Sequence, residues 1–142
     1  MAIAQGATNT FKVGLLDGSY DFGTTTFKIA LYTGAASIGP DTTAYTTDGE
    51  VVASGYTAGG EILTVTQVPT IGNQTGNAVA YLSFSNVTWT SALTARGALI
   101  YKSGSGNPTV CVLDFGADKT STTTFTVQFP AATDTAAIIR IA

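Results

Sequence analysis

Short segments in which apolar and polar residues alternate are the feature of this sequence that most restricts its fold. In residues 24–33, TTTFKIALYT, large apolar side chains recur at every second position as Phe27, Ile29 and Leu31. A period of two places successive side chains on opposite faces of a β-strand. Comparable segments, bounded by glycine, proline, asparagine or serine turns, follow along the chain at residues 61–68, 77–89, 94–102, 109–115, 121–129 and 136–141.

These segments predict about seven to eight strands in a single domain that spans residues 1–142. Composition agrees, because 26 threonines and 16 glycines favour pleated sheet and turns over helix. The expected fold is therefore all-β, an antiparallel β-sandwich of jelly-roll type, with a Greek-key barrel as the alternative. Pro69 should end the pairing of its segment or mark an edge strand.

Two regions do not fit the strand pattern. Near the N-terminus, apolar residues at helical spacing predict one short helix, begun by Asn9 or Thr10 and stopped by Gly18. Residues 1–10 would then contain a free or docked N-terminal arm. Residues 34–60 are rich in turn residues and are expected to be mostly loop, with a short element around 50–54.

The residue types present argue against an enzyme. Histidine is absent, which removes the commonest general base and metal ligand. Two acidic pairs, Asp114 with Asp118 and Asp48 with Glu50, offer too few oxygen ligands for a metal site. No catalytic residue, cofactor site or metal site is therefore predicted.

The distribution of charge restricts the partners. Net charge is −3 and the pI is near 4.5, so nucleic acid is not expected as a partner. No apolar run reaches the roughly 20 residues that cross a bilayer, and the N-terminus lacks the pattern of a signal peptide. We expect a soluble protein made in a cytoplasm, without membrane contact. The six basic residues are scattered along the chain: Lys12, Lys28, Arg96, Lys102, Lys119 and Arg140.

Low charge also bears on association. Charged residues make up 11% of the chain, far fewer than the roughly 25% of an average soluble domain. A domain that packs against neighbours and a simple threonine-rich domain of secreted type both fit this composition. Cys111 lies between valines and is expected to be a small buried hydrophobe. Trp89 is expected in the core, although a sugar-binding module would use it as a stacking platform.

The amino-acid sequences of several segments resemble those of small structural proteins of tailed-bacteriophage virions. The segments that carry this resemblance are FKVGLLDGSYDF, TTTFKIALYTGAA, TTAYTTDGEVVASGYTAGGEIL, ARGALIYKS, VLDFGADKTSTTTFTVQFP and AAIIRI. Within that group the chain is most similar to jelly-roll cement or decoration proteins. The resemblance implies a location on the head surface of the virion, with the major capsid protein as partner, and a homodimer or homotrimer at symmetry axes.

Alternative functions remain open at this level. The second candidate is a tail or baseplate structural or adsorption protein, and a carbohydrate-binding β-sandwich module is less favoured. Loops and termini adapt to a partner more readily than strands do, and tyrosine is favoured in interfaces. The expected protein-contact residues are therefore Met1, Ala2, Ile3, Ala4, Gln5, Tyr45 and Tyr56.

Overall fold

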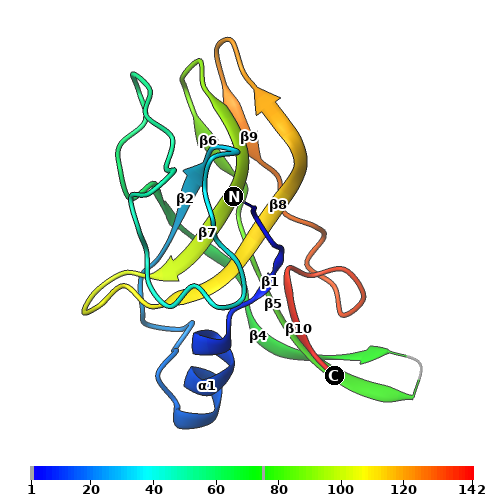
Figure 1. Cartoon of the computed structure of the whole chain (residues 1–142). Helices are drawn as coiled ribbons and strands as arrows, with labels where there is room; N and C mark the ends of the chain where they lie inside the picture. The colour runs from blue at the N-terminus through cyan, green and yellow to red at the C-terminus, as the bar shows by residue number, and fades with distance from the viewer. Residues whose placement is uncertain (1, 75) are drawn as a thin grey trace.

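A computed structural model describes residues 2–74 and 76–142, so Met1 lies outside the described residues (Figure 1). All ladders between the described strands are antiparallel, which confirms the all-β prediction. The elements in chain order are β1 (Gly6–Ala7), α1 (Asn9–Asp17), β2 (Phe27–Tyr32), β3 (Glu61–Leu63), β4 (Val65–Gln74), β5 (Asn77–Phe84), β6 (Val87–Trp89), β7 (Thr94–Lys102), β8 (Thr109–Thr120), β9 (Phe125–Val127) and β10 (Ile139–Ile141).

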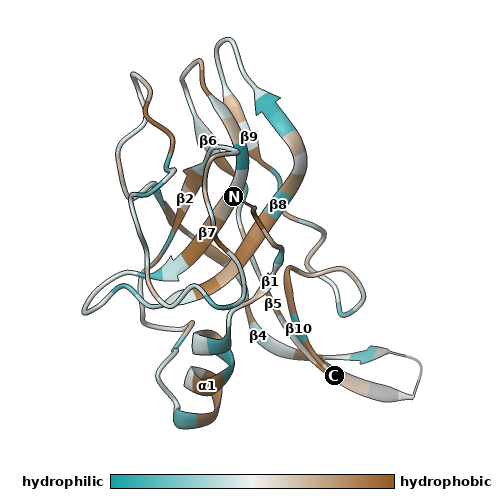
Figure 2. Cartoon of the chain, viewed as in Figure 1, coloured by the Kyte–Doolittle hydropathy of each residue, from teal (hydrophilic) through white to brown (hydrophobic). Residues whose placement is uncertain are grey.

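The strands form a sandwich of one large and two smaller sheets. The large sheet has the order β1-β8-β7-β2-β3, and the smaller sheets have the orders β10-β5-β4 and β6-β9. Between them lies the main core, in which β2 and β7 of the large sheet contribute Ile29 and Ile100 and the smaller sheets contribute Phe84 and Trp89. Figure 2 shows β2 in brown, as expected for a central strand. The jelly-roll connection order stays a prediction.

A second core covers the outer face of the large sheet. It gathers Ala30, Tyr32 and Leu99 with Ile38 from the loop of residues 34–60 and with the partly buried Ile3. Strand β2 is therefore buried on both faces, and its alternation separates two cores rather than core from solvent. The predicted loop character of residues 34–60 is confirmed, with an isolated bridge between Glu50 and Tyr32 as its contact to β2.

Two expected strands are each divided in two. Residues 61–68 belong to β3 and β4, which lie in different sheets, and residues 77–89 belong to β5 and β6, which also lie in different sheets. Strands commonly change sheets at the corners of sandwiches. Side-chain alternation continues through such a corner, so the pattern alone did not reveal it. These divisions, together with the short β1, raise the number of described strands to ten.

Strand β4 confirms the prediction for Pro69. This strand is the outer strand of its sheet, and its ladder with β5 shifts register between Val65 and Gln67 and again between Gln67 and Thr70. Pro69 therefore lies in an irregular part of an edge strand, where its missing N–H is tolerated. The pairing continues beyond it, so β4 is longer than expected.

The expected hairpin of residues 94–102 and 109–115 is present as β7 and β8. Strand β8 extends beyond the expected end, to Thr120. In its ladder with β7, Asp114 pairs with Gly97 but the next pair is Lys119 with Ala95, so β8 moves five positions where β7 moves two. Four residues of β8 therefore lie opposite the single residue Arg96 of β7, and the three extra residues make a large bulge. Bulges of this kind increase the twist of a strand and bend it.

Helix α1 closes one end of the sandwich and is stopped by Gly18 in a left-handed conformation, as predicted. Its N-cap is Thr8, one residue before the expected Asn9. The Thr8 hydroxyl accepts a hydrogen bond from the N–H of Phe11 at 3.2 Å and lies 3.1 Å from the carbonyl oxygen of Val110. Within residues 2–74 and 76–142, no helix has the length and apolar character that a membrane crossing requires.

Replacing Thr8 with valine should therefore destabilise the protein by about 1–3 kcal/mol. The side chain is fully buried, and valine keeps its shape while leaving the Phe11 N–H without its cap. Urea unfolding followed by circular dichroism measures the change. Thr10→Val is the matched control, because the Thr10 hydroxyl makes no hydrogen bond among the described residues. Equal losses would contradict the capping role.

Candidate interaction surface

The N-terminal arm lies on the body of its own domain. The N–H of Ala4 donates to the carbonyl oxygen of Ile38 at 2.9 Å, and the N–H of Ile38 donates to that of Ala2 at 3.2 Å. Ile3 packs into the outer core, and the Gln5 side chain accepts from the N–H of Asp114 at 3.1 Å. Ala2, Ala4 and Gln5 remain exposed. Their contact with another protein stays a prediction, as does that of Met1.

Tyr45 and Tyr56, the other two expected contact residues, converge on Glu50. One Glu50 carboxylate oxygen accepts from the Tyr45 hydroxyl at 2.6 Å. The other accepts from the Tyr56 hydroxyl at 2.8 Å and from the N–H of Gly59 at 2.7 Å. We call Tyr45, Glu50, Tyr56 and Gly59 the Glu50 cluster. It fastens the loop of residues 34–60 to itself and, through the N–H of Leu31 that donates to the Tyr56 hydroxyl, to β2.

The environment of the Glu50 cluster keeps its tyrosines protonated. Burial raises the pKa of Tyr45 and of Tyr56, and the hydrogen bond of each hydroxyl to the Glu50 carboxylate raises it further. Glu50 is 7% exposed and Tyr56 is 9% exposed, whereas Tyr45 is half-buried. An interface role for Tyr56 thus has little side-chain surface available to it. It stays a prediction for Tyr45.

Of the acidic residues considered as metal ligands, Asp114 and Glu50 each bind other groups of the protein. Asp114 pairs with Arg96 at 3.3 Å, and the N–H of Gly116 donates to the same carboxylate oxygen at 2.8 Å. The Gly116 hydrogen bond, followed by Arg96, lowers the pKa of Asp114. Glu50 is buried in its cluster while Asp48 is exposed. Among the described residues, no group of three or more potential ligands is close enough to hold a metal ion.

Trp89 lies in the core, as predicted. It is 2% exposed and packs between Tyr56 and Phe125, with ring centroids 6.0 and 6.3 Å away. Its indole N–H has no hydrogen-bond partner among the described residues. A ring in this position presents no face to solvent, so the stacking platform of the sugar-binding alternative is not formed by Trp89.

Cys111 is a buried free thiol, as predicted. Burial raises its pKa to about 12, so the thiol stays protonated near neutral pH, and its sulfur is also shielded from reagents. The native protein should therefore resist Ellman's reagent for hours, while the urea-unfolded chain should react at once. Rapid labelling of the native protein would contradict this placement of Cys111.

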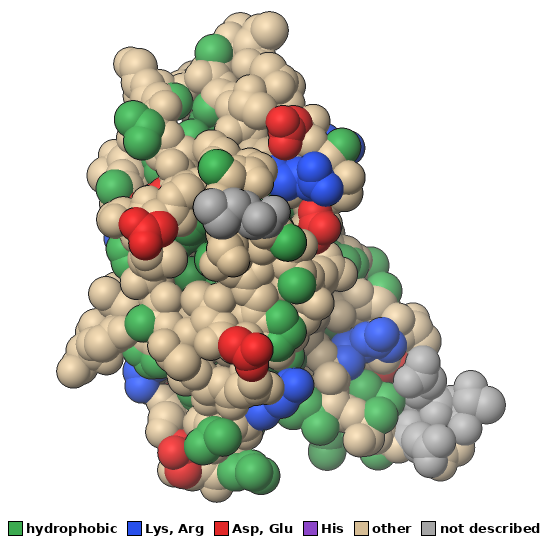
Figure 3. Space-filling view, in the orientation of Figure 1, with side chains coloured by type: hydrophobic (Ala, Val, Ile, Leu, Met, Phe, Trp, Pro, Cys, Tyr) green, Lys and Arg blue, Asp and Glu red, His purple; other side chains and the backbone are tan. Residues whose placement is uncertain are grey.

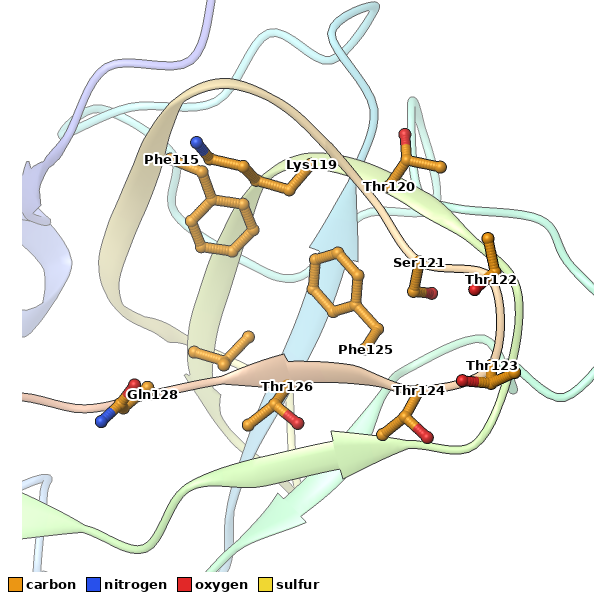
Figure 4. Close-up of a pocket in the computed structure, with 11 residues that line it drawn as sticks. Phe115, Lys119, Thr120, Ser121, Thr122, Thr123, Thr124, Phe125, Thr126 and Gln128 are labelled. Carbon is orange, nitrogen blue, oxygen red and sulfur yellow. The ribbon is translucent and has the colours of Figure 1, made fainter.

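A surface hollow with a volume of about 650 Å³ lies between β8 and β9 (Figure 4). Figure 4 shows the rings of Phe115 and Phe125 facing each other inside it, and Lys119 beside them. The remaining lining is chiefly hydroxyl groups and one amide, from Ser121, Gln128 and the threonines 120, 122, 123, 124 and 126.

Exposed apolar side chains concentrate on α1 and on the sheet of β4, β5 and β10. Of the eight large apolar side chains that are exposed among the described residues, six lie there. Figure 3 shows hydrophobic groups at this lower end of the molecule, with acidic and basic side chains beside them. We call these six the apolar end: Val13, Leu15, Leu16, Val68, Ile71 and Ile141.

The sheet of the apolar end carries an apolar row across all three strands. Ile71 of β4 is paired with Ala80 of β5, and Ala80 is paired with Ile141 of β10. Directly opposed residues of an antiparallel sheet lie on the same face. Ile71 is 76% exposed and Ile141 is 51% exposed, so the outer parts of this row face solvent.

Two hollows lie on either side of β10, next to the row. One, of about 460 Å³, lies between α1 and the sheet, and the other, of about 370 Å³, lies between β10 and β8. Both are lined by Phe11 and Leu15 of α1 and by Ile139 and Ile141 of β10. Such apolar, concave surface is typical of places where proteins bind one another.

The sequence around this sheet contains no charge over a long stretch. No Asp, Glu, Lys or Arg occurs from Ile62 to Ala95, a stretch that includes all of β4 and β5. Figure 1 shows the β4–β5 hairpin extending away from the body at the lower right. A projecting hairpin normally carries charges that discourage association. This stretch can be read from the sequence and marks the surface that the predicted contact residues missed.

Comparisons of this chain with protein-family models, with curated proteins and with solved structures return no match.

Proposed function

We propose that this chain is a structural protein of a tailed-phage virion. In this role it binds the outside of the major capsid protein shell as a cement or decoration protein and stabilises the head. The observation that carries the proposal is the apolar end, where six exposed apolar side chains gather on α1, β4 and β10. The resemblance of several sequence segments to small virion proteins gives this surface its expected partner.

The properties of the domain suit such a role. Its long loop is fastened by the Glu50 cluster, and its arm is hydrogen-bonded to the body, so little conformational freedom is lost on docking. The exposed apolar side chains can themselves be buried without desolvating ions, although Lys12, Asp17 and Arg140 lie on the same elements. Each contact is modest, but many copies on one shell add their contributions and hold neighbouring capsid subunits together.

Co-sedimentation with heads tests the proposal. Purified protein is mixed with expanded, empty phage heads that have been stripped of it, and the bound copies are counted per major capsid subunit. We expect saturation at a simple ratio. Binding should depend less on salt than binding between oppositely charged surfaces does, because apolar side chains make the proposed contact. Failure to bind heads, together with detection of the chain in isolated tails, would overturn the proposal in favour of the tail alternative.

Two lysine variants locate the contact. Leu16 of α1 is 92% exposed and Val52 of the long loop is 97% exposed, so neither substitution disturbs the core. Leu16→Lys should weaken binding to heads at least tenfold, because it adds a charge to the apolar end. Val52→Lys should bind as the unchanged protein does. Equal effects of the two variants would place the contact elsewhere.

A further inference from the structure

The free edge of β4 differs from the other edges of the two larger sheets. Natural edge strands avoid pairing with other chains by being short or by carrying charge, proline or bulges. Strand β3 carries Glu61, β10 carries Arg140, and β1 has two residues. Strand β4 has ten residues and no charge.

Only the first half of β4 has features that protect an edge strand from pairing with another chain. Both register shifts lie between Val65 and Thr70, and Pro69 lies in the same part. From Thr70 onward the pairing with β5 is regular. Among the described residues, no loop or helix makes a backbone hydrogen bond to this second half. Alternate N–H and C=O groups of residues 70–73 therefore point toward an open edge.

We propose that β4 pairs with β4 of a second copy, antiparallel and around a two-fold axis at Ile71. The edge is self-complementary in this register. Ile71 lies opposite Ile71 of the other copy, Thr70 opposite Gly72, and Pro69 opposite Asn73. The paired segments carry no charge of their own, although the Asp134 side chain covers Gly72 in each copy. The two apolar rows join into one across a six-stranded sheet.

The same pairing is disfavoured at the other edges. Two β10 strands centred on their middle residue would place Arg140 against its copy, and like charges directly opposite destabilise a strand pair. Two β3 strands would bring their Glu61 carboxylates close together. The second half of β4 is thus the edge at which a second copy meets no repulsion.

The pairing is weak in dilute solution. Five paired residues span about 17 Å of edge, which buries far less than the roughly 800 Å² per partner of a stable interface. The dimer is therefore concentration-dependent. It becomes more complete when neighbouring copies are held side by side on a common surface, because the second contact is then intramolecular in effect.

Cysteine cross-linking tests the pairing in the full chain. Directly opposed strand residues have Cα atoms about 4.5–5.5 Å apart, within the range of a disulfide. Ile71→Cys should form a disulfide-linked dimer under mild oxidation at least tenfold faster than Ile62→Cys. The control residue Ile62 is 62% exposed, against 76% for Ile71, and lies on the charged β3 edge. The buried Cys111 does not compete.

Sedimentation velocity gives the second measurement. The mean mass of the unchanged protein should rise toward that of a dimer with concentration, and Ile71→Lys should remain a monomer. Equal cross-linking of the two cysteine variants, or a rise in mass for Ile71→Lys, would overturn the proposed pairing. A third outcome would also overturn it: the protein without substitutions is a monomer, and Ile71→Lys abolishes its binding to heads. The β4 edge would then contact the capsid shell and not a second copy. Head binding itself is tested separately by Leu16→Lys.

Discussion

Gly60→Ala is expected to lose at least about 4 kcal/mol of folding free energy or to give no soluble protein. Gly60 has φ +74°, and a Cβ atom there would lie 1.8 Å from the carbonyl oxygen of Ile29. Ile29 is fully buried in the central strand β2, so its backbone cannot move aside. The clash displaces either β2 or the turn that follows the Glu50 cluster.

Gly106→Ala is the matched control for this prediction. Gly106 has nearly the same backbone conformation, φ +75°, but no atom lies within 4 Å of the added Cβ. Both variants incur the roughly 1–2 kcal/mol of a left-handed alanine, so their difference measures the contact with Ile29 alone. Guanidinium unfolding midpoints provide the comparison. Similar midpoints for both variants would mean that the close approach at Gly60 is absent.

Glu50→Ala is expected to cost about 3–5 kcal/mol and to lower Tm by on the order of 10 °C. The substitution leaves the Tyr56 hydroxyl and the N–H of Gly59 buried without an acceptor, each at about 1–3 kcal/mol. The half-buried Tyr45 hydroxyl can turn to water and adds less. Differential scanning calorimetry measures the loss.

Glu50→Gln keeps the size of the side chain and one of its acceptor oxygens, so it shows how much of the loss in Glu50→Ala comes from missing acceptors. The glutamine oxygen can still accept from Tyr56 and Gly59, while its NH₂ group donates to the Tyr45 hydroxyl. We expect a loss of about 1 kcal/mol. If glutamine were as damaging as alanine, the acceptor geometry described for Glu50 would be wrong. A negligible effect of both variants would mean that the loop is held by other contacts.

The strand pattern was predictable because alternation is a local property. Residues 24–33 and 94–102 contain β2 and β7 almost as expected, and Gly18 ends α1 as its left-handed conformation predicts. The corners after Leu63 and Phe84 were not predictable, because the change of sheet depends on which distant strand offers a partner. The cap at Thr8 was missed for a similar reason: its hydroxyl also reaches Val110, 102 positions away.

The candidate site was predictable in part. Tyr45 and Tyr56 were predicted as protein-contact residues, and both hydroxyls bind Glu50 of the same chain. Nothing local in the sequence distinguishes an interface tyrosine from one that binds a buried carboxylate. In the sequence, Glu50 belongs to an acidic turn with Asp48. Its burial could not be predicted, since it depends on the pairing with Tyr32 of β2 and on the loop folding back. The uncharged stretch from Ile62 to Ala95 was visible in the sequence. Its meaning required knowing that β4 is an edge.

That uncharged stretch also affects how quickly the β4–β5 hairpin meets a partner. Oppositely charged surfaces attract each other before contact and raise association rate constants to 10⁸ M⁻¹s⁻¹ or more. Without such a field, productive encounters depend on random orientation, and the rate constant falls to about 10⁵–10⁶ M⁻¹s⁻¹. The rate of binding then depends on the concentration of the protein, and high affinity must come from slow dissociation.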